Sequence, residues 1–328
     1  MVRKLNKAFY NTVLSQTFSP CGNYLIVGDI YGVISVFHLS KIVQPESNLN
    51  KEELTPKNKF IVTENFQINS LLTTHTHLIV GSVGEIYAYQ WKHVKNGKNV
   101  QPVWTIAIPE QKGAFNKTDI NCLLCNDEAG YIYAGCGDNN IYVIEIESRK
   151  FVKTLNKHKD YIHCLTINGN DMISGGEDGL VNIWDLRTYK VSNKIQPHLS
   201  DKVARSELGI WIGALSSNDD YVLCGGGPRL SLWHYRFLTN SSVFPIDDKG
   251  IHVADIYNDK VLAGGQSKLF YQMSFVGDII SEIPTSAVTT YSAIHQQEPF
   301  SVLCIAGSSP KIDICNNFMY KNQQLSLY

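Results

Sequence analysis

The feature that most constrains the fold is a short motif that recurs along the chain, a glycine turn followed by a strand rich in β-branched and aromatic residues. The stretch Gly-Asp-Ile-Tyr-Gly-Val-Ile-Ser-Val-Phe, from Gly28 to Phe37, is one example. The first glycine of the motif recurs at seven positions: Gly28, Gly81, Gly135, Gly175, Gly225, Gly264 and Gly307. These glycines are 53, 54, 40, 50, 39 and 43 residues apart, a period typical of repeats that each form one supersecondary unit. The motif therefore predicts seven structurally similar units.

Each unit has the composition of a small antiparallel sheet, because the apolar runs are bounded by glycine, asparagine and aspartate turns. A four-stranded sheet of this kind cannot bury both of its faces alone, so it is stable only between neighbouring sheets in a closed ring. We therefore predict an all-β fold, a seven-bladed β-propeller formed by residues 15–328 as one domain.

The N-terminal segment, residues 1–14, is predicted to lie outside this ring. Leu5, Phe9 and Val13 fall at i, i+4 and i+8, a spacing that indicates a short helix. The first inner strand is expected to begin near Ser15 and the last outer strand to cover residues 323–327. Each blade then receives four consecutive strands, and the N-terminal segment is left to clasp the ring.

Insertions account for the longer intervals between the repeated glycines. The main one, residues 41–58, is rich in Lys, Glu, Asn and Pro and is predicted to be a mobile loop. A shorter insertion is expected near residues 93–99. Loops of this kind are where a binding protein usually differs from its relatives.

The overall charge argues against a strongly basic nucleic-acid binder. Lys and Arg number 29 and Asp and Glu 30, so the net charge is −1 and any contact with RNA is expected to be indirect. The eight cysteines lack the dense spacing of a small disulfide scaffold, which favours reduced thiols inside the cell. We expect no signal peptide and no membrane span, because no run approaches the roughly 18 apolar residues that a membrane helix needs.

The fourth unit resembles a nearly complete WD repeat. It contains a His in the loop before the first strand, Ser174-Gly-Gly-Glu-Asp178-Gly at the glycine turn, and Trp184-Asp185-Leu-Arg187 in the third strand. In that family the loop His, the strand Ser, the turn Asp and the strand Trp form a buried hydrogen-bond chain. The resemblance implies this structural role for His158, Ser174, Asp178 and Trp184.

Further stretches are similar to the THO complex subunit 6 family and are spread from the first unit to the sixth. They are Phe18-Ser-Pro-Cys-Gly22, Asp160-Tyr-Ile-His-Cys-Leu165, Ser174-Gly-Gly-Glu-Asp-Gly179, Trp184-Asp-Leu-Arg-Thr188, Cys224-Gly-Gly-Gly-Pro228 and Val243-Phe-Pro-Ile246. The resemblance implies a nuclear, non-catalytic subunit of the THO part of the TREX assembly, which packages nascent mRNA for export. It also implies partners among the other THO subunits, especially the coiled-coil subunits 5 and 7.

Two motifs could suggest bound ligands. Cys122-x-x-Cys125 has the spacing of a zinc knuckle, but residues three apart on a strand point to opposite faces and no second Cys or His pair completes the site. The run from Gly225 to Pro228 could suggest a phosphate cradle, yet it lacks the Gly-Lys-Ser/Thr ending and a following helix. We expect no metal and no cofactor, and a hairpin turn at the glycines.

A catalytic role for His158 and Asp178, as a base and its orienting group, is also disfavoured. A hydrolase would need an exposed nucleophile and an oxyanion site, whereas Ser174 is predicted to be buried. We therefore predict no catalytic residues.

The Trp-Asp-x-Arg sequence that ends at Arg187 allows an alternative function. It resembles the box through which some WD-repeat proteins dock on a cullin-4 ubiquitin ligase adaptor, so Asp185 and Arg187 are candidate partner-binding residues of a ligase substrate receptor. Four nearby lysines could contact RNA or an acidic partner, or simply be solvated on an outer strand: Lys150, Lys153, Lys157 and Lys159.

Overall fold

The chain forms seven antiparallel sheets of four strands. The computed structural model describes residues 7–43, 52–110, 117–246 and 249–328. Within these residues every sheet is built from four strands that are consecutive in the chain. This is the blade number and blade topology of a seven-bladed β-propeller, so the predicted fold class is confirmed. The chain divides into two compact units, residues 1–106 with 283–328 and residues 107–282, which are described in turn.

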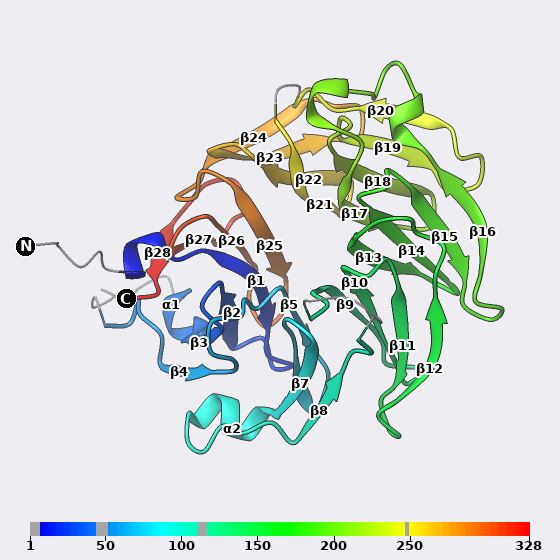
Figure 1. Ribbon diagram of the computed structural model, residues 1–328. Helices are drawn as coiled ribbons and strands as arrows, with labels where there is room; N and C mark the ends of the chain where they lie inside the picture. The colour runs from blue at the N-terminus through cyan, green and yellow to red at the C-terminus, as the bar shows by residue number, and fades with distance from the viewer. Residues whose placement is uncertain (1–6, 44–51, 111–116, 247–248) are drawn as a thin grey trace, which may run out of the picture. The chain divides into compact units, whose positions relative to one another are not determined.

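The first unit contains the first, second and seventh sheets (Figure 1). The first sheet comprises β1 (Val13–Phe18), β2 (Tyr24–Asp29), β3 (Val33–His38) and β4 (Asn58–Ile61). The second comprises β5 (Ser70–Thr73), β6 (His77–Gly81), β7 (Glu85–Gln90) and β8 (Trp104–Ala107). The seventh comprises β25 (Thr290–Gln296), β26 (Val302–Gly307), β27 (Lys311–Cys315) and β28 (Gln323–Ser326).

The second unit contains the third to sixth sheets. The third comprises β9 (Ile120–Asn126), β10 (Tyr131–Cys136), β11 (Ile141–Glu145) and β12 (Lys150–Leu155). The fourth comprises β13 (Ile162–Asn168), β14 (Asp171–Gly176), β15 (Val181–Asp185) and β16 (Lys190–Ile195). The fifth comprises β17 (Ile212–Ser217), β18 (Tyr221–Gly226), β19 (Ser231–His234) and β20 (Asn240–Val243), and the sixth β21 (Ile251–Tyr257), β22 (Lys260–Gly265), β23 (Leu269–Ser274) and β24 (Ile279–Pro284).

The repeated glycines lie at the end of the second strand of each sheet, where the neighbouring sheet approaches most closely. A Cβ atom added to Gly175 would lie 2.7 Å from Ile212 Cγ2 at the start of β17. In the same way, a Cβ at Gly135 would lie 2.8 Å from Ile162 Cγ2, and one at Gly28 would lie 2.5 Å from Ile68 Cγ2. At these three positions only glycine leaves room for the isoleucine of the next sheet. The repeated glycine in the sequence therefore reflects a repeated contact between adjacent sheets.

The apolar cores lie between adjacent sheets. In the second unit, Ile173 and Val181 of the fourth sheet pack with Ile212 and Val222 of the fifth, and all four are fully buried or nearly so. The second strands are covered on both faces, as the five successive buried residues of β14 show. Burial of this area is the main favourable term in the stability of each pair of sheets.

The N-terminal segment differs from the predicted helix over residues 5–13. Leu5 lies outside the described residues, a 3-10 helix covers only Lys7–Tyr10, and Val13 is the first residue of β1. Phe9 is 77% exposed, so the i, i+4, i+8 spacing does not form a buried stripe. The reason is that Asn11 ends the helical turn: its side chain accepts a hydrogen bond from Thr12 N and donates to Asp29 Oδ2 at 2.7 Å and to the Tyr328 hydroxyl at 2.9 Å.

Helices are short in the described part of the chain. They are the 3-10 helix at Lys7–Tyr10, α1 (Leu39–Ile42), α2 (Trp91–Asn96) and two further 3-10 helices, Pro197–Leu199 and Ser206–Leu208. The expected loop near residues 93–99 thus begins as α2, and α1 opens the insertion at 41–58, of which residues 44–51 lie outside the described part. None of the described helices has the length and hydropathy needed to cross a membrane.

Candidate interaction site

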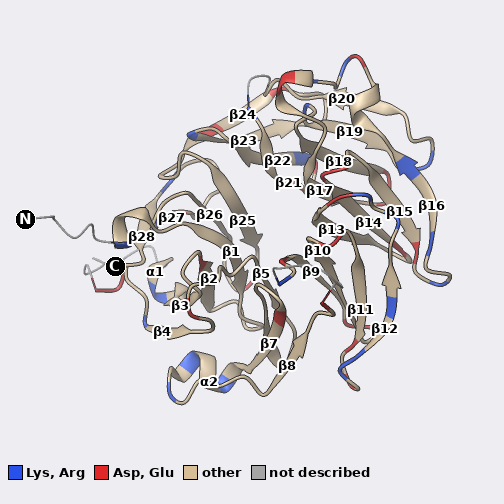
Figure 2. Cartoon of the chain, viewed as in Figure 1, with Lys and Arg blue, Asp and Glu red and all other residues tan. Residues whose placement is uncertain are grey.

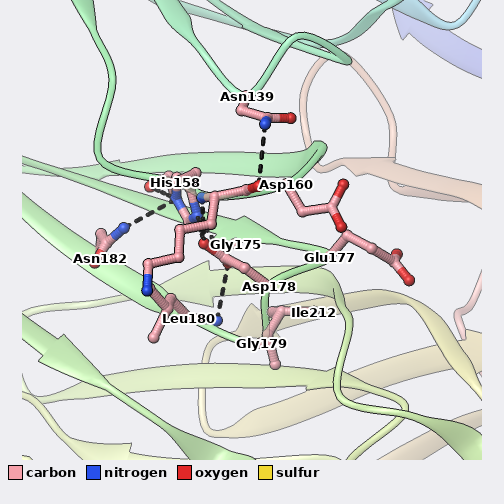
Figure 3. A network of polar contacts seen from close by, with 12 residues as sticks. Asn139, His158, Asp160, Gly175, Glu177, Asp178, Gly179, Leu180, Asn182 and Ile212 are labelled. Carbon is pink, nitrogen blue, oxygen red and sulfur yellow. Dashed lines mark hydrogen bonds and ion pairs between the residues drawn. The ribbon is translucent and has the colours of Figure 1, made fainter.

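The fourth sheet brings together the four side chains singled out in its sequence. His158 Nε2 lies 2.7 Å from Ser174 Oγ, and His158 Nδ1 lies 3.0 Å from Asp178 Oδ1. Trp184 Nε1 donates to Ser174 Oγ at 2.8 Å. Figure 3 shows the contact between His158, from the loop before β13, and Asp178, from the turn between β14 and β15. The chain of hydrogen bonds therefore runs from the loop before β13, through β14, to β15.

Asn182 extends this network, although no motif in the sequence indicated it. Its Nδ2 lies 3.2 Å from His158 Nε2, and the residue is 3% exposed on β15 (Figure 3). An amide N–H donating to Nε2 requires that nitrogen to be an acceptor, so the ring proton is on Nδ1 and points at Asp178. Ser174 then donates its hydroxyl proton to His158 and accepts the Trp184 N–H.

Asp178 is the anionic end of the network. Burial alone would raise the pKa of this carboxyl, but hydrogen bonds from His158 and from the backbone N–H groups of Lys159 and Leu180 lower its pKa below the usual value. The carboxylate therefore ties the loop before β13 to the turn after β14. This arrangement stiffens one end of the sheet and the surface loops that it carries.

The same three side chain types occur in serine hydrolases, yet the geometry here does not support nucleophilic catalysis. Ser174 is fully buried, and its oxygen already accepts the Trp184 N–H. A substrate carbonyl could not reach this oxygen without displacing the core. The network can bind and orient protein groups, and we interpret it as structural.

Asp185 and Arg187 lie at the surface where β15 ends. Arg187 Nε donates to Asp185 Oδ1 at 2.9 Å, and the Arg187 side chain is 72% exposed. Hydrogen bonds from the Arg187 side chain lower the pKa of Asp185 below its usual value. The aspartate therefore holds the guanidinium in one orientation while leaving most of it open to a partner.

The Gly225–Pro228 run presents carbonyl oxygens, whereas a phosphate cradle must present N–H groups. The carbonyl oxygens of Gly226, Gly227 and Pro228 accept hydrogen bonds from the Arg205 guanidinium at 2.8–3.2 Å. Arg205 is only 3% exposed and donates also to Ile246 O at 3.1 Å. A loop that presents carbonyl groups holds a cation, so this turn is organised around an arginine of the same chain.

The two cysteines of β9 contact different groups. Cys122 Sγ approaches Gly135 O at 3.9 Å, whereas Cys125 Sγ donates to Asp127 Oδ1 at 2.9 Å. Burial raises the pKa of both thiols to about 12, which keeps them protonated at neutral pH. Across the described ranges, no group of three or more His, Cys, Asp or Glu side chains is arranged to hold a metal ion.

The four lysines noted near the blade edge are all exposed. Lys150 and Lys153 belong to β12, the outer strand of the third sheet, and Lys157 and Lys159 follow in the loop before β13. Figure 2 shows basic residues along β12 and β16 within the second unit. These side chains give this edge of the third sheet an exposed, positively charged surface.

The fold and the network of the fourth sheet define the class of protein, a WD-repeat β-propeller. The family model described as WD domain, G-beta repeat matches residues 149–185, which include most of the network. Among solved structures, the WD40 domain of Pan2 from Neurospora crassa is similar, with a TM-score of 0.67 and 13% identity over 90% of this chain and 86% of that one. A likeness at this identity concerns the fold alone.

Sequence relatives identify the family within that class. The chain is 34% identical to the THO complex subunit 6 homolog of Danio rerio over 96% of its own length and 97% of the relative. It is 33% identical to THO complex subunit 6 of Homo sapiens (96% and 92%) and 32% identical to that of Drosophila melanogaster (100% and 93%). The chain belongs to the THO complex subunit 6 family, as its sequence motifs predicted.

Proposed function

We propose that this chain is a non-catalytic scaffold subunit of the THO complex in the nucleus. In this role it supports mRNA processing and nuclear export through contacts with the other THO subunits, especially the coiled-coil subunits 5 and 7, while RNA contact is indirect. The observation that carries the proposal is the similarity of 32–34% to proteins named THO complex subunit 6 over nearly the whole chain.

The physical properties of the chain support a binding role. The polar side chains that could be mistaken for catalytic groups are buried in the network of the fourth sheet, where they hold the loops of the sheet in place. The net charge of −1 gives no general attraction to a phosphate backbone. Rigid sheets with fixed loops are well suited to present a pre-organised surface to protein partners.

The test is recovery of partners from nuclear extract with the affinity-tagged chain. We expect the other THO subunits to be recovered, and we expect RNase treatment before capture to leave their yield unchanged. Absence of every other THO subunit from the captured material would refute the proposal, and loss of the subunits after RNase would refute the indirect contact with RNA.

A second candidate function is a substrate receptor of a cullin-4 ubiquitin ligase, favoured by the exposed and pre-oriented Arg187. Arg187→Ala should then abolish capture of the ligase adaptor, while thermal stability changes little because the side chain is at the surface. Arg149→Ala, at an exposed arginine before β12, is the matched control and should retain capture. Unchanged adaptor binding by Arg187→Ala would remove this candidate.

A further inference from the structure

A cavity of about 330 Å³ lies in the first unit, between the end of β3 and the start of β4. It is lined by His38, Lys41, Glu52, Glu53, Thr55 and Lys57. Pockets that hold small ligands start at about this volume, so the space suits one side chain or one small group. None of the family motifs in the sequence involves these residues.

Basic groups gather around one aromatic ring beside this cavity. The His38 ring stacks on Tyr24, with centroids 4.8 Å apart and an angle of 12° between the planes. Lys57 Nζ lies 5.2 Å from the Tyr24 centroid and Lys95 Nζ lies 5.7 Å from it. Each contact is a cation–π interaction, but two ammonium groups on one ring also repel each other.

Lys95 is held in this position from a different sheet. It belongs to α2, between β7 and β8 of the second sheet, whereas Lys41 lies in α1 and Lys57 directly precedes β4, both in the connection between β3 and β4 of the first sheet. Asn58 Nδ2 donates to Lys95 O at 2.7 Å and to Val94 O at 3.3 Å, so the end of α2 is fixed to the start of β4. Trp91 and Val94 of α2 are buried in a core cluster that also includes Ile34 of β3, so the helix is packed against the first sheet as well as its own.

Two titratable groups near the cavity have pKa values that the lysines help to lower. Burial lowers the pKa of His38 below its usual value, and the charges of Lys41 and Lys57 lower it further. Burial would raise the pKa of the Cys21 thiol, but hydrogen bonds from Ser19, from the Asn23 backbone and from Lys95 bring it down to about 7. The lysine charges therefore add to the effect of burial at His38 and to the effect of the Ser19 and Asn23 hydrogen bonds at Cys21.

We propose that this cavity, which is lined by Lys41 and Lys57 and adjoined by Lys95 through the Tyr24 ring, binds the phosphate of a phosphorylated serine or threonine in a peptide. A phosphate dianion would relieve the repulsion between the lysines and accept charge-assisted hydrogen bonds from their ammonium groups. Glu52 and Glu53 line the same space and partly neutralise the lysines, so they should limit the affinity.

A peptide fits this site better than RNA. One cavity lined by two lysines, with a third lysine on the adjoining ring, matches a single phosphate, whereas single-stranded RNA is usually held along a basic groove with several stacking aromatics. The one ring at the site, Tyr24, is already stacked on His38. The inference goes beyond the proposed function, because it does not depend on membership of the THO complex.

The test is fluorescence anisotropy with the full chain and a labelled pentapeptide, Gly-Gly-phosphoserine-Gly-Gly. We expect the phosphopeptide to bind at least about tenfold more tightly than the Ser peptide, because a charge-assisted contact is worth about a factor of ten or more. Inorganic phosphate should compete with it. Lys57→Ala and Lys95→Ala should each weaken binding about tenfold, whereas Lys92→Ala, at an exposed lysine of the same helix, should leave it unchanged.

The glutamates provide a test of the sign of the ligand charge. The double variant Glu52→Gln and Glu53→Gln should tighten phosphopeptide binding a few-fold, and weaker binding would overturn the proposal. Equal binding of the Ser and phosphoserine peptides would also overturn it. So would binding of a labelled 20-nucleotide poly(U) RNA that depends on Lys57 and Lys95 while the phosphopeptide does not bind.

Discussion

Removal of the Ser174 hydroxyl is the perturbation that most directly tests the network of the fourth sheet. In Ser174→Ala, Trp184 Nε1 loses its acceptor in a side chain that is 1% exposed, and His158 Nε2 keeps only the Asn182 contact at 3.2 Å. Two net hydrogen bonds of about 1 kcal/mol each are lost, and an unpaired buried N–H adds a desolvation cost of about 1–3 kcal/mol. We expect the free energy of unfolding to fall by about 3–5 kcal/mol.

The assay is urea denaturation of Ser174→Ala, Trp184→Phe and the double variant, followed by the tryptophan-independent far-ultraviolet circular dichroism signal. Phe lacks the N–H, so the double variant no longer leaves that donor unpaired. We expect the sum of the two single-variant losses in the free energy of unfolding to exceed the loss in the double variant by about 1 kcal/mol or more. Losses that add within about 0.5 kcal/mol, or a Ser174→Ala loss below that value, would refute the reasoning.

A matched comparison isolates the part of the effect that comes from the histidine. Ser231 of the fifth sheet is also fully buried and accepts Trp233 Nε1 at 2.9 Å, but its hydroxyl reaches Cys224 O at 3.4 Å. Ser231→Ala should therefore cost less than Ser174→Ala. An equal or larger cost at Ser231 would show that the His158 contact contributes nothing to stability.

Three further predictions concern charges elsewhere in the fold. Arg205→Met should lower the free energy of unfolding by about 3 kcal/mol or more, because it leaves several buried carbonyl groups without their donor, and a loss within 1 kcal/mol by urea denaturation would contradict this. Burial and the neighbouring His163 lower the pKa of His252 to about 4 from its usual 6.5, so the folded state keeps it neutral while the unfolded state protonates. Stability should therefore fall as the pH drops from about 6.5 to 4, by up to about 3 kcal/mol, and His252→Phe should show a smaller fall over that window in pH-dependent thermal melts. Iodoacetamide at pH 7 should label Cys21 first among the cysteines because its pKa is about 7, and Lys95→Ala should slow the reaction, as peptide mass spectrometry would show. Preferential labelling of another cysteine would contradict the assignment.

The sequence predicted best those features that depend on spacing within one repeat. Gly28, Gly135 and Gly175 each face an isoleucine at or just before the first strand of the next sheet, so at these positions the period of the motif is also the period of a contact. The hydrogen-bonded side chains of the fourth sheet were predicted from the resemblance of this unit to a WD repeat, in which His158 and Trp184 match positions of one repeat.

Features that depend on distant segments could not be predicted from local patterns. Arg205 donates to carbonyl groups of residues 226–228 and 246, and nothing in the sequence around it indicates those acceptors. Lys95 reaches Tyr24 only because Asn58 fixes α2 to another sheet. The spacing of Leu5, Phe9 and Val13 predicted a helix that extends to Val13, but the helical turn covers only Lys7–Tyr10. Val13 instead pairs with Asp29 of β2, a distant segment that the local spacing does not indicate.

The four-strand plan of each sheet also bears on how such a chain can change over evolutionary time. A sheet whose strands are consecutive is encoded by one uninterrupted stretch, so a duplicated or exchanged stretch carries a complete structural module with it. The connections between modules, such as the segment with the two 3-10 helices before β17, can lengthen without disturbing any strand pairing. New binding surfaces can therefore arise in the segments that connect the sheets, while the strand pairing within each sheet is retained.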